Sequence, residues 1–490
     1  MLGLVRSMKN DFAPISRIPP DVFSLIPGYL EGIGDKNLIR MTHVCRGWRE
    51  LLIACPSLWA HIYCENADRT RVYIERSKLS PLKLSIHDLW GATYLKDALL
   101  LVVPHVSRLK SLIICGRRET LQTLTPHFSC PLPLLRELII NLACTPVPVL
   151  DTVLFNGDLS SLCSLSLSGV TTHLPWKNLS RLTTFNLSRV SEDKISITQL
   201  LDFFEDAHHL RDITLNESVP TSSNAPPGRM VSLPCLKKLV IHADLFHSII
   251  LNHLSIPAGA SMTLDFEFTG DESPVTDFLP KSLNNLKNIY PISSINLSLD
   301  GVEKCVRLEG QNGGLYMFGE WVDQDGLSAF VLDNQILRSL SCFDLSGTQR
   351  LAVARYISPT VARIDKSAPY YILSRMKDLR TLTLTQCNNL PFILALNPVQ
   401  NPSKCVIRPE VEALVLYVKK LELFRIEELE SMAKERVSAG KKLPSVTIIG
   451  LGGLLPGREV FKLKKYVTRV DYRVQEQPPE WDNTSEDGGK

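Results

Sequence analysis

Residues 18–59 read IPPDVFSLIPGYLEGIGDKNLIRMTHVCRGWRELLIACPSLW, and this stretch decides how the rest of the chain is interpreted. Its apolar residues recur at helical intervals in three short blocks, which predicts three short helices. The blocks are Val22, Phe23 and Ile26; Leu38 and Met41; and Val44, Cys45, Trp48 and Leu51. A module of about 45 residues encloses too little of its own surface to bury all of these side chains. We therefore expect another chain to cover part of the module.

The same stretch carries a family resemblance. The run Val44-Cys45-Arg46-Gly47-Trp48 matches a Val-Cys-(basic)-x-Trp signature, Ile18-Pro19 stands where Leu-Pro is usual, and Leu58-Trp59 matches a closing Leu-Trp. At these positions the segment resembles an F-box, the family of adaptor-binding modules found in cullin-RING ubiquitin ligases. The continuation through residues 56–84 is similar to fungal members of that family.

The resemblance implies an adaptor-binding surface. Its expected residues are Ile18, Pro19, Val22, Ile26, Leu38, Val44, Cys45, Trp48, Leu51, Leu58 and Trp59. We expect the two tryptophans to contribute most, because buried aromatic side chains dominate interface energetics. The pair Pro27-Gly28 departs from the family pattern, and a proline costs about 3 kcal/mol in a helix interior. The first helix is therefore predicted to kink or to end early.

Composition narrows the class of protein. The 490 residues include 54 Lys and Arg against 51 Asp and Glu, which gives a net charge of +3 and no charge-driven argument for nucleic acid or membrane as a partner. The 12 cysteines are scattered without C-x-x-C pairs or Cys/His spacing, so neither a metal site nor a disulfide framework is predicted. The start of the chain lacks the features of a signal peptide, and we expect an intracellular protein, cytoplasmic, nuclear or both.

Beyond residue 64 a short apolar triplet recurs, with spacings of three and then two residues. Its members are Leu79, Leu82, Leu84; Leu109, Leu112, Ile114; Leu135, Leu138, Ile140; Leu162, Leu165, Leu167; Leu182, Phe185, Leu187; Leu210, Ile213, Leu215; Leu236, Leu239, Ile241; Leu264, Phe266 (partial); Ile292, Ile295, Leu297; Leu340, Phe343, Leu345; Leu379, Leu382, Leu384; Val411, Leu414, Leu416; and Leu443, Val446, Ile448. The last two residues of a triplet lie on one face of a strand. Helical patterns at 94–106, 200–210, 275–286 and 352–364 separate some of these strands.

Strand, turn and helix in this order predict an α/β fold: a small all-helical F-box module followed by a leucine-rich-repeat-like solenoid. The expected domains are an N-terminal tail at 1–12, the F-box-like module at 13–63, the solenoid at 64–474 and a disordered tail at 475–490. Residues 218–229 form a predicted loop. Residues 310–326 are rich in turn formers and aromatic residues, which predicts a projecting hairpin.

In such a solenoid the residue between the two paired apolar residues points outward from the open sheet face. We expect target-binding residues at these positions: Ser166, Asn186, Thr214, Asp265, Asn296, Asp344 and Thr383. Hydroxyls, amides and isolated carboxylates suit recognition of a protein better than catalysis, since the row offers no convergent acid–base pair. Solvated strand residues with no partner are the alternative.

An enzyme remains a third interpretation. The strand at 446–450 leads into Gly450, Gly452 and Gly453, with Asp471 further on, as a dinucleotide site would require. However, Leu455 occupies the third glycine position and Pro456 disrupts the helix that would hold the phosphates. We therefore expect no cofactor and no catalytic residue.

The sequence favours a non-catalytic substrate-recognition subunit of a Skp-cullin-F-box type ubiquitin ligase. Its partners would be a Skp-type adaptor with its cullin-RING ligase, and an unknown target protein. The alternative is a repeat-based scaffold outside any ligase, whose F-box-like module has drifted.

Overall fold

The computed structural model describes residues 18–19, 22, 25–26, 36–87, 95–128, 130–143, 149–150, 159–172, 179–189, 195–216, 228–243, 247–268, 279–280, 282–299, 303–321, 336–337, 339–354, 367–385, 390–397, 411–418, 426–451 and 457–475. These residues form two compact units. The first contains the described residues up to Arg189 together with 206–210, and the second contains the other described residues from Ile195 on. Each unit combines helices with a large, mainly parallel sheet.

The first unit opens with short helices. They are α3 (Lys36–Thr42), α4 (Arg46–Ile53) and the 3-10 helix η3 (Pro56–Trp59). Cys45 is the N-cap of α4, where its Sγ accepts a hydrogen bond from the Trp48 backbone N–H at 3.4 Å. A proline in the first turn of η3 needs no backbone donor there, so Pro56 suits the start of that helix.

Six strands of the first unit pair in chain order, and every pairing is parallel. They are β1 (His61–Tyr63), β2 (Leu82–His87), β3 (Leu109–Gly116), β4 (Glu137–Leu142), β6 (Ser164–Ser168) and β8 (Thr184–Ser188). In β6, Leu165 and Leu167 are buried while the serines between and beside them are half-buried. The strict alternation of leucine and serine therefore gives one core face and one open face. The two-residue strands β5 (Val149–Leu150) and β7 (Thr171–Thr172) form a separate small sheet.

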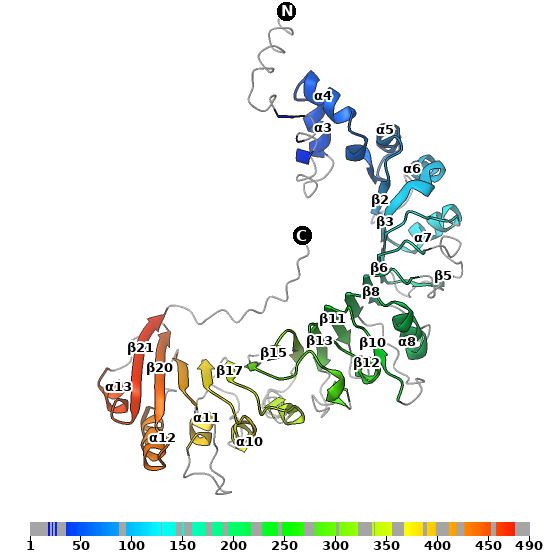
Figure 1. The fold of residues 1–490 in the computed structure, drawn as a ribbon. Helices are drawn as coiled ribbons and strands as arrows, with labels where there is room; N and C mark the ends of the chain where they lie inside the picture. The colour runs from blue at the N-terminus through cyan, green and yellow to red at the C-terminus, as the bar shows by residue number, and fades with distance from the viewer. Residues whose placement is uncertain are drawn as a thin grey trace, which may run out of the picture. The chain divides into compact units, whose positions relative to one another are not determined.

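Helices fill several connections between these strands. They are α5 (Ala67–Ser77), α6 (Leu95–Val102), η4 (Val103–Arg108), α7 (Arg118–Leu124) and η5 (Thr125–His127). Helices α5, α6 and α7 lie on the same side of the strands (Figure 1). Arg108 ties the end of η4 to the turn before β2, because its guanidinium donates to the Ser77 hydroxyl and to the Ser80 carbonyl. The core of this unit lies between the helices and the leucine face of the sheet.

The sheet of the second unit has eleven strands, in the order β9-β11-β13-β16-β15-β14-β17-β18-β19-β20-β21. They are β9 (Asp212–Asn216), β11 (Lys238–Ala243), β13 (Ser261–Phe268), β14 (Ser294–Leu299), β15 (Glu303–Glu309), β16 (Gly314–Trp321), β17 (Arg350–Ala354), β18 (Thr381–Thr385), β19 (Ala413–Val418), β20 (Leu443–Leu451) and β21 (Val467–Gln475). All pairings are parallel except those of β15, which runs antiparallel to both of its neighbours. Strands β10 (Val231–Ser232) and β12 (Leu254–Ser255) pair separately.

The helices of the second unit are α8 (Ile197–Asp206), η9 (His247–His253), η11 (Leu283–Asn285), η12 (Leu340–Cys342), α10 (Ser367–Arg375), α11 (Leu390–Ala395), α12 (Ile426–Ser438) and α13 (Gly457–Leu463). Helices α10 to α13 lie on one side of strands β17 to β21 (Figure 1). Arg436 of α12 is buried and joins neighbouring elements, since its Nη1 donates to the Leu396 carbonyl at 3.2 Å and its Nε to the Lys441 carbonyl at 3.2 Å. Burial lowers the pKa of this guanidinium from its ordinary value.

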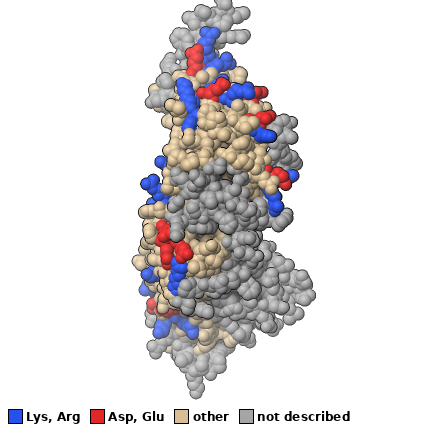
Figure 2. All heavy atoms as spheres, turned by 90° about the vertical axis from the view of Figure 1, so that its right-hand side faces the viewer, with Lys and Arg blue, Asp and Glu red and all other residues tan. Residues whose placement is uncertain are grey.

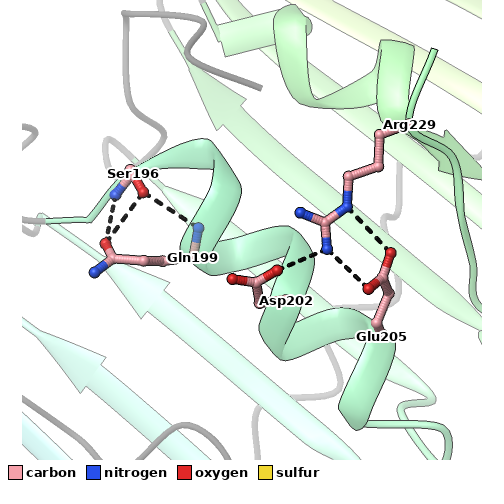
Figure 3. A network of polar contacts seen from close by, with 5 residues as sticks. All are labelled: Ser196, Gln199, Asp202, Glu205 and Arg229. Atoms are coloured by element: carbon pink, nitrogen blue, oxygen red, sulfur yellow. Dashed lines mark hydrogen bonds and ion pairs between the residues drawn. The ribbon is translucent and has the colours of Figure 1, made fainter. Parts of the chain in front are cut away.

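Two groups of polar contacts, a capping box and an ion-pair cluster, fix α8 (Figure 3). At its start the Ser196 N–H donates to Gln199 Oε1 at 2.9 Å and the Gln199 N–H donates to Ser196 Oγ at 3.2 Å, which is a capping box. Further along, Arg229 Nη2 lies 2.7 Å from Asp202 Oδ1 and 2.8 Å from Glu205 Oε2. These hydrogen bonds raise the pKa of Arg229, so the guanidinium stays charged and holds the segment before β10 against the helix.

Several sequence predictions for the second unit are wrong. Residues 310–321 do not project from the sheet, because β16 forms an antiparallel hairpin with β15 inside the sheet and pairs with β13 on its other side; residues 322–326 lie outside the described residues. The triplet at Leu340 is buried but forms η12 and a turn, and the neighbouring strand is instead β17 at 350–354. This strand overlaps the start of the predicted helix at 352–364, and the rest of that helix lies outside the described residues. Within the predicted helix at 275–286, the described part contains only η11. Residues 218–227 of the predicted loop and 476–490 of the predicted tail lie outside the described residues, whereas Gln475, predicted as the start of the tail, is the last residue of β21.

Candidate functional site

A small apolar cluster holds α3 and α4 together. Met41 and Leu52 are buried at its centre. Partly buried apolar side chains pack around them, namely Ile18, Ile26, Leu38, Trp48, Leu51 and Leu58. All six belong to the predicted adaptor-binding set. Arg49 adds a polar link, since its Nε donates to the Thr42 carbonyl at 2.9 Å. The cluster gives the segment a core of its own, and its outer side chains remain partly accessible.

Among the described residues of this segment, three large apolar side chains are exposed. Val22 is 47% exposed, Leu25 60% and Val44 59%. Val22 and Val44 were predicted at the adaptor surface, whereas Leu25 was not, although it lies one helical interval after Val22. Of the remaining predicted residues, Pro19 is exposed and Cys45 is half-buried as the N-cap of α4. Pro27 and Gly28 lie outside the described residues, and so does any kink that they cause.

Trp59 has a different place from the one predicted. Its side chain is 1% exposed, and its Nε1 donates to the Leu52 carbonyl at 2.8 Å. The ring of Tyr73 meets it edge-on with centroids 5.1 Å apart, and the guanidinium of Arg76 lies 4.3 Å above it. Both partners are on α5. Trp59 is therefore an interior residue that joins η3 to α5, and not part of the exposed apolar surface.

Cys64 follows β1 and provides a pH test of this junction. The thiol is buried, and burial raises its pKa from 9.0 to about 12. Because the thiolate is disfavoured only in the folded chain, the stabilisation is complete below pH 9 and is lost as the pH rises toward 12. Within this window we expect the free energy of unfolding to fall by about 1.4 kcal/mol per pH unit from this group.

The measurement is the urea midpoint of the native chain and of Cys64→Ala at several pH values between neutral and strongly alkaline. The variant lacks the thiol, so its stability should decline less steeply above pH 9 than that of the native chain. If the stabilities of the two proteins declined in parallel as the pH rises, the pKa of Cys64 would not be raised in the folded chain.

The open face of the first sheet carries small polar residues. Ser166 of β6 pairs with Asn186 of β8, and Ile139 of β4 lies on the other side of Ser166. The Asn186 Oδ1 atom is buried and has no hydrogen-bond partner among the described residues. Two residues further along these strands, Asn141 of β4 pairs with Ser168 of β6. There Arg189 Nη2 donates to Ser168 Oγ at 3.0 Å and to Asn141 Oδ1 at 3.3 Å. Both predicted target-binding residues of this unit therefore lie on the open face.

The open face of the second sheet holds four more predicted residues. Thr214, Asn296 and Thr383 belong to one row of paired residues that crosses the sheet. Asp265 lies in the adjacent row, where its Oδ2 is 2.7 Å from Nδ1 of His242 on β11. Asp344 is not on a strand. It follows η12, accepts a hydrogen bond from the Ser346 N–H at 3.1 Å, and its pKa is lowered by its hydrogen bonds to Ser346.

Aromatic residues on this face were not among the predicted site residues. Tyr316 and Phe318 of β16 present nearly parallel rings with centroids 6.4 Å apart, and the guanidinium of Arg307 on β15 lies 5.3 Å from the Tyr316 ring. The alternation of residue types at 303–309 and 314–321 was the signal that could have revealed these strands. In the first unit, His61, Tyr63 and His87 form a comparable stack, with centroids 4.3 Å and 6.4 Å apart.

Neither sign of charge has a surface region to itself on the face that can be followed in Figure 2. On the face shown in Figure 2, the Lys and Arg side chains of the described residues lie mixed with Asp and Glu. Within the described ranges, no group of three or more His, Cys, Asp and Glu residues could hold a metal ion. None of the helices in the described part of the chain is both long and apolar enough to span a membrane. The glycine-rich turn that was considered and rejected as a dinucleotide site falls largely at 452–456, outside the described residues.

The family model for F-box-like domains matches residues 15–65, which include α3, α4 and the exposed apolar residues. The chain therefore carries an F-box-like domain at residues 15–65. F-box domains bind Skp-type adaptors in cullin-RING ubiquitin ligases, and F-box proteins are typically non-catalytic substrate receptors. No curated protein matches the chain.

Proposed function

We propose that this chain is the substrate-recognition subunit of a Skp-cullin-F-box type ubiquitin ligase. The F-box-like domain binds the adaptor, and the open faces of the two sheets bind a target protein. The chain itself performs no chemistry. It raises the rate of ubiquitin transfer by holding the target close to the subunits that carry ubiquitin, since proximity and orientation alone can supply a large part of a rate enhancement.

The observation that carries the adaptor half of this proposal is the exposure of Val22, Leu25 and Val44 within the matched segment. Exposed apolar side chains next to a small core mark a surface that another chain covers. The same segment keeps its other apolar residues in its own cluster. A partner would therefore meet a surface that is already organised, and the cost of ordering it on binding would be small.

The target half rests on the repeat architecture. We interpret the two sheets as parts of a degenerate leucine-rich-repeat-like solenoid, because parallel strands follow one another in register and helices lie on one side. This arrangement leaves an open face of alternating side chains. We assign target recognition to this face, with Ser166, Asn186, Thr214, Asp265, Asn296 and Thr383 as its polar residues. Asp344 is omitted because it is not on a strand.

The test is co-purification of the full chain with a Skp-type adaptor, comparing Val44→Glu with the native protein. A carboxylate at this exposed position leaves the fold intact but must be desolvated when an apolar partner covers it. We expect the variant to bind about 2 kcal/mol more weakly, roughly a thirtyfold loss of affinity. The matched control is Val437→Glu, at a similarly exposed valine on α12 in the second unit.

Equal adaptor binding by the native chain and Val44→Glu would show that the exposed apolar surface is not the adaptor contact. A native chain that fails to retain the adaptor would instead favour the repeat scaffold with a drifted F-box-like module. The departure at Pro27-Gly28 is the feature of the sequence that supports this alternative.

A further inference from the structure

Strand β21 lies at one edge of the sheet in the second unit. It pairs along its whole length with β20, and no described residue pairs with its other edge. An edge of nine residues that no described strand covers presents a row of backbone donors and acceptors that can bind another extended strand. We propose that this edge pairs in antiparallel fashion with β21 of a second copy of this chain, which joins two sheets into one. The proposal is independent of adaptor binding.

The two faces of β21 differ in the way that such a contact requires. Val470 and Tyr472 pair with Val446 and Ile448 of β20, which are buried, so they extend the core face of the sheet to its edge. They are only half-buried themselves, and Val474 on the same face is 54% exposed. The core of the second unit therefore ends in an apolar row that further strand pairing would cover.

The open face of β21 carries charges of both signs, Arg469, Asp471 and Arg473. In a twofold dimer of strands, a contact between residue i of one copy and residue j of the other implies a second contact, between residue j of the first copy and residue i of the second. If the twofold axis passes through Tyr472, Asp471 of each copy lies opposite Arg473 of the other. On the core face, Val470 of each copy lies opposite Val474. The single register thus forms two opposite-charge pairs and two apolar pairs, each of which stabilises an antiparallel sheet.

Neighbouring registers are less complementary. An axis through Asp471 places the two aspartates opposite each other and Arg469 opposite Arg473, so every charged pair on the open face is repulsive. An axis through Val470 also pairs Asp471 with Arg469 of the other copy, so its charged pairs are attractive. That register, however, sets Tyr472 against Thr468 and leaves Val474 beyond the paired residues. Charge and apolarity together therefore select the axis through Tyr472.

The experiment is sedimentation velocity of the full chain over a range of concentrations. We expect a concentration-dependent dimer of the native protein. Arg473→Asp and Asp471→Arg each convert two attractive pairs into two repulsive ones, so each should weaken the dimer by about tenfold or more. The double variant restores both pairs with exchanged signs and should restore the dimer. An equimolar mixture of the two single variants should form heterodimers, because every charged pair between them is again attractive.

Control variants Lys462→Asp and Glu427→Arg make the same charge changes at exposed positions on α13 and α12, and should dimerise like the native chain. Circular dichroism spectra and urea midpoints verify that each variant is folded, and Arg473→Asp is the cleaner of the two because it leaves intact the ion pair of Arg469 with Asp471 of its own strand, at 2.8 Å. A native chain that is monomeric throughout, a dimer that persists in both single variants, or a folded double variant that stays monomeric would each overturn the proposal.

Discussion

Replacing Trp59 with alanine is expected to destabilise the first unit by about 3–5 kcal/mol, the range measured for truncation of fully buried large aromatic residues. The side chain is almost completely buried between η3 and α5. Its loss removes the edge-on contact with Tyr73 and the cation–π contact with Arg76, and it deprives the Leu52 carbonyl of the indole donor. The junction between the F-box-like domain and α5 would then lose its main aromatic support.

A chain with two compact units need not unfold in a single transition, so the measurement should report on the junction itself. We propose amide hydrogen exchange, with protection of α5 as the readout alongside the urea midpoint. Trp59→Phe is the matched control, because it keeps an aromatic ring in the site and removes the N–H donor, at an expected cost of about 1 kcal/mol. Unchanged protection of α5 in Trp59→Ala would contradict a role for Trp59 in joining the two parts.

The position of Trp59 also shows where sequence reasoning stops. The closing Leu-Trp of the motif was predicted at the adaptor surface, since a large aromatic residue dominates an interface as readily as it dominates a core. Whether the aromatic residue lies in a core or at an interface depends on its tertiary neighbours. For Trp59 these are Tyr73 and Arg76, which follow it in the chain by 14 and 17 residues. No periodicity within residues 18–59 contains that information.

The strands of the repeat region were more predictable where local pattern and tertiary packing agree. The sequences Ser-Leu-Ser-Leu-Ser of β6 and Thr-Leu-Thr-Leu-Thr of β18 alternate with period two, and the structure buries their leucines. The triplet spacing failed at Leu340, Phe343 and Leu345, all of which are buried although they lie in η12 and a turn. Burial at intervals of three and two residues fits a turn as well as a strand. The spacing alone therefore cannot distinguish the two.

The site was predictable in part for a similar reason. Outward positions on regular strands, such as Ser166 and Thr383, follow from the alternation of side chains across a strand. The aromatic residues Tyr316 and Phe318 were missed because the site residues were predicted only at positions of the recurring apolar triplet. The antiparallel strands β15 and β16 do not contain that triplet. Their place in the sheet requires long-range pairing with β13 and β14, which no local pattern specifies.

Replacing Gly169 with alanine is the second substitution for which we expect a large loss of stability. Gly169 follows β6 and has a φ of 65°, a left-handed conformation that costs an L-residue about 1–2 kcal/mol. A Cβ atom at this position would also lie 2.1 Å from the Leu142 carbonyl oxygen at the end of β4. That oxygen belongs to the backbone of a strand that is paired on both sides, so it cannot simply move away.

We expect a total cost of about 3 kcal/mol or more for Gly169→Ala, as the overpacking adds to the conformational penalty. Gly440→Ala separates the two contributions. Gly440 has a φ of 71° at the end of α12, and a Cβ there meets nothing within 4 Å, so it should cost only the conformational part, about 1 kcal/mol. Urea midpoints of both variants measure the difference. If Gly169→Ala cost no more than Gly440→Ala, strands β4 and β6 could separate to admit a methyl group, and the close approach of Gly169 to Leu142 would not be a requirement of the fold.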